Sequence, residues 1–504
     1  DIIEIFKGSD LFGTVYEQIF AYEPYDRAKY PNALTVLPGE FVTTDDGSGI
    51  VHLAPAFGED DYAMSKSHNL PFVQNVTRDG HFTDNMGEFA GRAIKHFTYA
   101  DHEEEGSDKD VVIALKIAGK IYRSTNDYLH SYPHCWRTGN PVMYYARESW
   151  FIKSPEYKQE MLDNNDKIKW QPKEIGEGRF GNWLKEVKEW SLSRDRFWGS
   201  PIPIWVDEDG LNPFAIGSIA ELKETGIYIH PDGTREALKD SDLEIDLHRP
   251  FVDNIVFERD GKDYHRIPEI TDAWFDSGSV PFAQFHYPFE NKELFEENFP
   301  CDFIAEGIDQ TRGWFYTLHN ISTALFGKPA FKNIVVNELI LDKKGLKMSK
   351  SKGNTVDPFE VMEKYGADAV RWYLFVNNPP WKPTSFNEED IAKTVISDFF
   401  RSLTNTYAFF TLYANIDKFD GTEELIPASE RPEIDRWIIS RVNTLLRKYI
   451  NWMDDFDLTK AHRAIQHFAI HELSNWYIRR NRRRFWKGEK DSDKIAAYQT
   501  LKEV

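Results

Sequence analysis

The sequence predicts a multidomain α/β protein, on three observations made in chain order. Residues 1–145 alternate short apolar runs with Gly, Pro and Asp turns, a pattern typical of a β-rich domain. Residues 302–306 are a candidate for a short buried strand and precede a Gly and a helix-like run at 310–326. This order of strand, turn and helix predicts a parallel sheet within residues 146–330. From about residue 391 onward, apolar positions recur at helical spacing, which predicts an α-helical bundle.

Within the first region, three runs and one helical pattern stand out. The runs at 41–47, 73–80 and 81–83 are short and border on turn residues, so we expect strands there. Over Asp108–Tyr122 the apolar residues recur at helical spacing, so we expect one helix. Residues 1–145 are therefore predicted to form a β-rich domain that contains a helix.

The other boundaries follow from changes in composition. A second buried strand is expected at 333–341, and residues 207–268 are polar and rich in turns, as expected of an insertion. We assign residues 146–330, with that insertion, to an α/β domain, residues 331–390 to a connecting region and residues 391–504 to the bundle. In the bundle, apolar residues share one helical face: Ile434, Trp437, Ile438, Leu445 and Tyr449.

Charge and cysteine content restrict the class of protein. The chain has 504 residues and a formal net charge of −21, which argues against a general polyanion binder. A local basic patch with interleaved aromatic residues nevertheless suits nucleic acid; its cations are Arg479, Arg480, Arg482, Arg483, Arg484 and Lys487. No run of about 18 apolar residues occurs, so we expect no membrane span. Only Cys135 and Cys301 are present, which favours the reducing cytoplasm.

The most specific motif is Lys347-Met-Ser-Lys-Ser-Lys-Gly-Asn354, which follows Gly345. Two lysines and two serines on a Gly-flanked loop can bind one polyphosphate through charge and hydroxyl hydrogen bonds. For an arbitrary cluster of this kind, a solvated basic turn is the commoner outcome. This string, however, is identical to the KMSKS loop of the class I aminoacyl-tRNA synthetases, which it resembles letter for letter.

Four further segments resemble the isoleucine branch of that family. They begin at Trp190 (Trp-Ser-Leu-Ser-Arg-Asp-Arg-Phe-Trp-Gly), Asp272 (Asp-Ala-Trp-Phe-Asp-Ser-Gly-Ser), Glu306 (Glu-Gly-Ile-Asp-Gln-Thr-Arg-Gly-Trp-Phe) and Leu473 (Leu-Ser-Asn-Trp-Tyr-Ile-Arg-Arg). The resemblance implies part of a Rossmann-type catalytic domain, a β-rich editing insertion and an α-helical anticodon-binding domain. Residues 331–390 would then be the stem-contact region that carries the lysine loop.

The resemblance also implies an activity and its residues. Isoleucine would be activated with ATP, accompanied by Mg²⁺, and then transferred to tRNA(Ile), which requires positioning and charge neutralisation rather than a covalent catalyst. Lys347 and Lys350 would be catalytic and, with Ser349 and Ser351, would bind ATP. The aminoacyl-adenylate would be held by Glu306, Gly307, Asp309 and Gln310, and Trp274 and Trp314 would wall the isoleucine pocket, although a lone tryptophan is usually core. The basic patch would contact tRNA.

A second chemistry is implied by the segment Asp46 to Asp61, which resembles the editing domain of the same family. An isoleucine pocket cannot strongly reject a side chain one methylene smaller, a limit for which these enzymes are the standard example. His52 would line the hydrolytic site and Asp61 would hold the α-ammonium of mischarged Val-tRNA(Ile). Gly47 and Gly49 would admit the terminal adenosine. The alternative is that the acids at 59–61 merely start a helix.

The sequence departs from the family pattern in two respects. The family's first ATP motif, His-x-Gly-His, does not occur in the chain. We therefore expect an internal piece of a longer protein that does not form the adenylate by itself. Thr138 follows Cys135 where some members have a second zinc-binding cysteine, so we expect no zinc site.

Two alternatives remain open at this stage. One is the valine or leucine enzyme of the same family, which fits the segments at Asp272 and Glu306 less well. The other is a catalytically inactive tRNA-binding module. In each case we expect a monomer.

Overall fold

The computed structural model describes residues 5–43, 48–125 and 129–504, apart from the side chain of Ser351. The chain divides into two compact units, Asp1–Glu148 and Ser149–Val504. The division lies close to the boundary expected at residue 145. Among the described residues, we find no helix that combines the length and the apolar character needed to span a membrane.

The first unit contains less regular β-structure than expected. Its described residues form two helices, α1 (Glu59–His68) and α2 (Asp108–Ile117), and one hairpin of β1 (Phe97–Tyr99) and β2 (His102–Glu104). The strands expected at 73–80 and 81–83 were wrong: the first forms one bridge, Val76 to Phe82, and the second forms that bridge and another from His81 to Ala93. Turns recur too often in residues 73–83 for longer stretches of strand pairing to form. The run expected at 41–47 lies partly outside the described residues.

Helix α2 begins where the sequence predicts but ends five residues before Tyr122. The cause is Gly119, which adopts a φ of +68°, a left-handed conformation that glycine tolerates and that ends a helix.

The central sheet of the second unit is parallel, as predicted. Its strand order is β14 (Cys301–Gly307), β15 (Phe331–Asn337) and β4 (Lys169–Gln171), with both pairings parallel. Strand β15 is the middle strand, and its residues Ile334–Val336 are buried, as is typical of a parallel strand covered on both faces. Because β15 begins at Phe331, the domain boundary expected between residues 330 and 331 was wrong.

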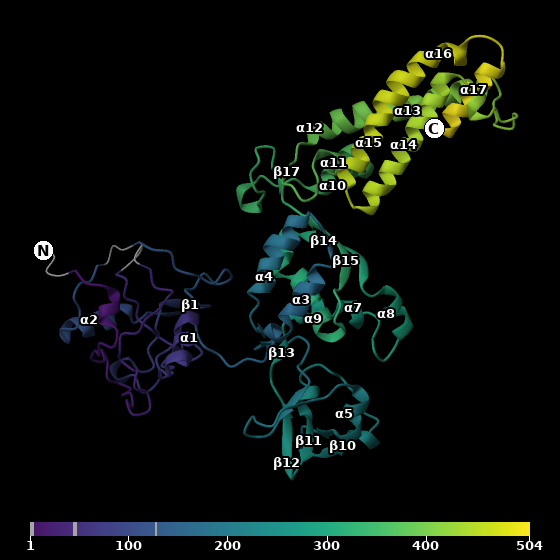
Figure 1. Ribbon diagram of the computed structural model, residues 1–504. Coiled ribbons are helices and arrows are strands. Elements are labelled where there is room, and N and C mark those ends of the chain that lie inside the picture. Colours follow the sequence, from purple (N-terminus) through teal and green to yellow (C-terminus); the bar gives the residue numbers. More distant parts are fainter. Residues whose placement is uncertain (1–4, 44–47, 126–128) are drawn as a thin grey trace. The chain divides into compact units, whose positions relative to one another are not determined.

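Helices cover this sheet, as Figure 1 shows for α3 (Lys158–Asn165), α4 (Gly181–Lys185) and α9 (Trp314–Phe326). Their apolar side chains pack with the strands into one core, in which Phe180, Phe315 and Phe331 are fully buried. Burying each such side chain stabilises the fold by roughly 1.5–3 kcal/mol. The remaining elements around the sheet are β3 (Phe151–Ile152), β5 (Trp190–Ser191), β6 (Ser193–Arg194), β13 (Ile270–Thr271), α6 (Ala273–Gly278), α7 (Val280–Ala283) and α8 (Lys292–Asn298).

The segment expected as a polar insertion is a six-stranded antiparallel sheet with its own core. Trp205 and Phe257 are buried in that core, with ring centroids 5.0 Å apart. The elements are β7 (Ile204–Val206), β8 (Phe214–Ala215), α5 (Ile219–Thr225), β9 (Ile227–Ile229), β10 (Arg235–Ala237), β11 (Ile255–Arg259) and β12 (Lys262–Arg266), in the order β10-β9-β11-β12-β7-β8. These strands were not predicted because most have only two or three residues and are separated by polar turns.

The C-terminal part of this unit is helical, as predicted. Strands β16 (Ile340–Leu341) and β17 (Thr384–Ser385) pair in parallel before it. The helices are α10 (Pro358–Tyr365), α11 (Ala367–Asn377), α12 (Glu388–Asp390), η9 (Ile391–Phe400), α13 (Arg401–Ile416), α14 (Glu433–Asp454), α15 (Leu458–His467), η11 (Phe468–Ile478), α16 (Arg479–Trp486) and α17 (Ser492–Glu503). Aspartates cap several of them, for example Asp491, whose Oδ1 accepts the Lys494 N–H at 2.9 Å. Ile438 of the predicted apolar face is fully buried in the bundle.

Candidate functional site

The lysine loop, residues 347–353, follows a tight turn after β16. Leu341 and Lys347 form an antiparallel bridge, and Gly345 between them adopts a φ of +76°, which favours glycine. Lys350–Lys352 form a single 3₁₀ turn. The side chains of Lys347 and Lys350 are exposed, so both charges are available to one ligand.

Asp342 and Asn354 hold the two ends of this loop. The Nδ2 of Asn354 donates to Asp342 Oδ2 at 2.9 Å and to the Lys347 carbonyl at 3.3 Å. Its Oδ1 accepts the backbone N–H of Ser349 at 2.9 Å. The amide of Asn354, followed by the N–H of Leu346, lowers the pKa of Asp342 below its usual value. The ends are therefore fixed by an ionised carboxylate at neutral pH. The Ser351 side chain lies outside the described residues.

The residues predicted to bind the adenylate lie where β14 ends. Glu306 and Gly307 are the last residues of the strand, at the edge where ligands bind in open parallel sheets. A β-carbon at Gly307 would lie 2.5 Å from Asp309 Oδ1, so the Asp309 carboxylate lies against this glycine. Gln310 Nε2 donates to Asp309 Oδ2 at 2.8 Å, and Gln310 Oε1 accepts the Trp314 N–H at 2.9 Å. The backbone at the start of α9 thus fixes the side-chain amide of Gln310.

Trp274 and Trp314 come together on the neighbouring helices α6 and α9. The Trp314 Nε1 donates to the carbonyl of Ser277 at 3.0 Å, which joins the two helices. A β-carbon at Gly313 would lie 3.1 Å from the Trp274 ring. Trp314 is half-buried against the core, whereas Trp274 is 44% exposed. These two rings, from adjoining helices, are the candidate wall of the pocket: Trp314 packs on the core and Trp274 is partly open to solvent.

Buried Asp272 positions Trp274. Its Oδ1 accepts the Trp274 N–H at 3.1 Å, which caps α6, and its Oδ2 accepts from Arg194 Nη2 at 2.6 Å. Sequence analysis singled out neither Asp272 nor Ser277 as a site residue, although both stand in the motif that contains Trp274. The hydrogen bonds around the two tryptophans and Gln310 join residues that lie between positions 194 and 314. Those that hold the lysine loop join residues between positions 341 and 354.

His52 and Asp61 are close enough for the charge of His52 to act on Asp61. Burial is the larger influence and raises the pKa of Asp61, whereas the Ala54 N–H and His52 oppose it. A β-carbon at Gly58 would lie 1.9 Å from Asp61 Oδ2, so the carboxylate folds back over Gly58, which precedes α1. Asp60, by contrast, is exposed. The acids do start helix α1, and of the three only Asp61 is partly buried.

His52 also lines a cavity of about 330 Å³ in the first unit. Other residues along it are largely apolar or aromatic, among them Phe20, Leu53 and Pro55. Asp61 does not line this cavity. Gly49 has a φ of +73°, so its backbone conformation favours glycine, and Gly47 lies outside the described residues.

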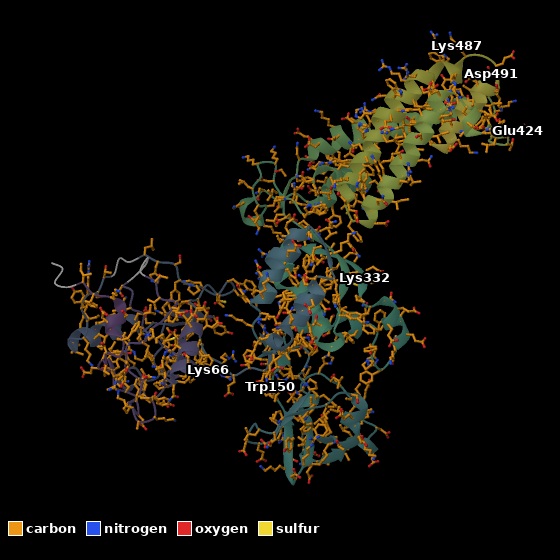
Figure 2. All side chains as sticks on the ribbon, in the orientation of Figure 1. Lys66, Trp150, Lys332, Glu424, Lys487 and Asp491 are labelled. Carbon is orange, nitrogen blue, oxygen red and sulfur yellow. The ribbon has the colours of Figure 1, made fainter. Side chains whose placement is uncertain are left out.

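The predicted basic patch lies on α16 and just beyond it. Arg479, Arg480, Arg482 and Arg483 are exposed, and Lys487 is exposed at the end of the helical bundle (Figure 2). Trp476 and Trp486 are also exposed, by 48% and 54%, and the Arg480 guanidinium lies 4.5 Å from the centre of the Trp476 ring. Exposed aromatic rings beside cations suit the stacking of bases and the binding of phosphates.

Arg484 does not share the exposure of that patch. Its side chain is 14% exposed and donates from both terminal nitrogens to the carboxylate of Asp435, each at 2.8 Å. Asp435 is fully buried and also accepts from the Tyr477 hydroxyl at 2.8 Å. Removing one partner of a buried pair costs about 3–5 kcal/mol. The sequence shows the charge of Arg484 but not its partner 49 residues earlier, so its assignment to a nucleic-acid surface is corrected to a structural role.

Neither cysteine forms part of a metal cluster in the described part of the chain. There, no group of three or more His, Cys, Asp or Glu side chains is arranged to hold a metal ion. Both cysteines are free thiols. Thr138, which replaces the second zinc-binding cysteine of some family members, forms a hydrogen bond to Cys135 and lowers the pKa of its thiol to about 7.

Comparison with known proteins places the chain in a family. Residues 51–386 match the family of class I tRNA synthetases for I, L, M and V, and residues 435–504 match the anticodon-binding domain of tRNA ligases. Isoleucine–tRNA ligases of Cytophaga hutchinsonii and Porphyromonas gingivalis are 48% and 44% identical, each over 99% of this chain. The chain covers 46% and 47% of them, so it spans about half the length of the curated relatives it matches.

A solved structure shares the fold over much of the chain. The Mycobacterium tuberculosis methionyl-tRNA synthetase in complex with methionyl-adenylate aligns with a TM-score of 0.52 at 19% identity, over 74% of this chain and 60% of that chain. A likeness at that identity shows the fold alone. The family match over residues 51–386 leads to one conclusion: the chain belongs to the class I tRNA synthetases of the isoleucine, leucine, methionine and valine group.

Proposed function

We propose that this chain carries the adenylate-binding, tRNA-binding and proofreading parts of an isoleucine–tRNA ligase. The observation that carries the proposal is the position of Glu306–Gln310 at the carboxyl end of a parallel strand, beside the wall of Trp274 and Trp314. The choice of isoleucine is supported by the relatives named isoleucine–tRNA ligase, which are 40–48% identical over nearly the whole chain.

In the first step, a carboxylate oxygen of isoleucine attacks the α-phosphorus of ATP and pyrophosphate leaves. Lys347 and Lys350 would neutralise the negative charge that grows on the phosphates, since both are exposed on one loop. Mg²⁺ would arrive with ATP, as is usual for this ion, and would add to that neutralisation. Asp309 and Gln310 would orient the adenylate.

In the second step, a ribose hydroxyl at the 3′ end of tRNA attacks the carbonyl carbon of the adenylate, and AMP leaves. The surface of Arg479, Arg480, Arg482, Arg483 and Lys487 would hold the tRNA through its phosphates. His52 and Asp61 would serve a separate hydrolysis, in which water attacks the ester of Val-tRNA(Ile) and releases valine. The two free cysteines agree with a cytoplasmic location, and we propose a monomer.

The pocket assignment is tested by Trp314→Ala in the full gene product that contains this chain. Loss of the rigid wall is expected to raise the KM for isoleucine at least about tenfold, since burying an aromatic side chain is worth about 1.5–3 kcal/mol. The KM for ATP should change little. The measurement is pyrophosphate exchange with each substrate varied. Trp198→Ala, at a 70% exposed tryptophan, is the control and should leave both values unchanged. Equal changes in both KM values for Trp314→Ala would refute the pocket role.

The tRNA surface is tested by comparing two arginines of α16. Arg482→Ala is expected to weaken binding of tRNA and to reduce the slope of log affinity against log salt by about one, as loss of one phosphate contact requires. Its thermal stability should not change. Arg484→Ala should instead lower the melting temperature, because it leaves Asp435 buried without its main partner. Filter binding at several salt concentrations and thermal melting measure both. An unchanged salt slope for Arg482→Ala would contradict the assignment.

A further inference from the structure

We propose that Asp342 and Asn354 form a clamp that sets the relative positions of Lys347 and Lys350, which makes both clamp residues positioning residues for ATP activation. The inference rests on the proposed function for its chemistry. The clamp itself rests on contacts at both ends of the lysine loop.

The first half of the clamp is the turn after β16. Asp342 Oδ1 accepts the N–H groups of Lys344 and Leu346, each at 2.9 Å. The backbone N–H of Asp342 also donates to the Leu346 carbonyl at 2.9 Å. These bonds occupy one carboxylate oxygen with the turn and leave the second, Oδ2, directed to Asn354.

The second half is Asn354, which reaches back across the loop. Its amide nitrogen bonds Asp342 and the carbonyl of Lys347, and its amide oxygen bonds the N–H of Ser349. One side chain thus holds the backbone on both sides of Met348. Asp342 and Asn354 are both half-buried, whereas the lysines are exposed.

Within this loop, the clamp residues hold the backbone, whereas the exposed lysines carry the charges that would meet ATP. The long lysine side chains are flexible, so the distance between their charges depends on where the backbone holds their α-carbons. A displacement of about 1 Å at a reacting centre can cost about 100-fold in rate. The clamp fixes the backbone at Lys347 and, through Ser349, immediately before Lys350. Without it, both charges would remain but their spacing would vary.

The test is a pair of variants in the full gene product. Asn354→Asp places a second carboxylate against Asp342, so the ends of the loop should repel each other. We expect kcat for isoleucine-dependent pyrophosphate exchange to fall about 10- to 100-fold, with the KM for isoleucine unchanged. Adding Asp342→Asn to this variant exchanges the two side chains, so the amide at 342 can donate to the carboxylate at 354. The 3.3 Å bond from residue 354 to the Lys347 carbonyl is lost in this double variant. This double variant should regain most of the lost rate. Asn387→Asp, at the start of α12, is the matched control and should behave like the wild type, since aspartate also caps helices.

Trypsin provides a readout that does not depend on activity. Cleavage after Lys347, Lys350 and Lys352, mapped by mass spectrometry, should be faster in Asn354→Asp and return toward the wild-type rate in the double variant. Unchanged cleavage in Asn354→Asp, or a double variant that exchanges no faster than the single one, overturns the clamp. A wild-type protein that lacks exchange with isoleucine would overturn the proposed function instead, and the cleavage rates would still decide whether the clamp exists.

Discussion

Replacing Lys350 with alanine in the full gene product is expected to lower isoleucine-dependent pyrophosphate exchange by about 10²–10³-fold, the usual effect of removing one donor that stabilises transition-state charge. Lys350 begins the 3₁₀ turn of the lysine loop and is exposed. Its charge is therefore free to approach the phosphates of ATP. The effect should appear in kcat more than in the KM for isoleucine, because the ammonium group acts on the leaving pyrophosphate.

Lys352 provides the matched control, because it lies in the same turn and is also exposed. Lys352→Ala removes an equal charge at nearly the same place, and we expect it to reduce exchange less than tenfold. Equal losses in the two variants would mean that only the summed charge of the loop matters. A near-normal rate in Lys350→Ala would refute the catalytic assignment of this loop.

Replacing Asp61 with alanine is expected to abolish hydrolysis of Val-tRNA(Ile) and to leave isoleucine activation close to normal. The carboxylate can pair with the α-ammonium of the mischarged amino acid, a charge-assisted contact that uncharged tRNA cannot make. Asp60→Ala should alter neither reaction, because Asp60 is exposed on the first turn of α1. The measurement is deacylation of pre-formed Val-tRNA(Ile). A wild-type rate for Asp61→Ala would remove the central residue of the editing site.

The same residue predicts a pH dependence. The ionised form of Asp61 would bind the ammonium group, and burial raises its pKa. Protonation therefore occurs at a higher pH than for an ordinary aspartic acid, so editing should begin to decline at a correspondingly higher pH as the solution is acidified. Affinity for Val-tRNA(Ile), measured as the pH is lowered from 7 toward the ordinary Asp pKa of about 3.9, should show this decline. In Asp61→Asn the decline should be absent.

Local patterns predicted the catalytic sheet and the bundle because each depends on neighbours in sequence. The run at 302–306, the following helix and the run from residue 333 became β14, α9 and β15, since apolar spacing specifies a strand or helix directly. The turns in residues 73–83 mark chain reversals correctly but do not reveal that the flanking runs make single bridges. The six-stranded sheet at 204–266 was not predicted because most of its strands are too short for an alternating pattern to be recognised.

The sequence named candidate residues for the site but not the contacts that hold them. The string from Lys347 to Asn354 identified the loop, and Asn354 was its last letter, yet its bond to Asp342 joins residues 12 positions apart. The ion pair of Arg484 with Asp435 was likewise not predictable from the sequence, because it forms only where α16 packs on α14. Sequence states which charges are present, whereas the fold decides which of them are already paired.

The most direct test of the central claim is amino-acid-dependent pyrophosphate exchange by the full gene product, with isoleucine, valine, leucine and methionine compared in parallel. The wall of Trp274 and Trp314 suits a branched aliphatic side chain, so the value of kcat/KM is predicted to be highest for isoleucine. Valine should be the nearest competitor, because a pocket discriminates weakly against the loss of one methylene. A higher kcat/KM for valine, leucine or methionine, or exchange that requires no amino acid, would contradict the account.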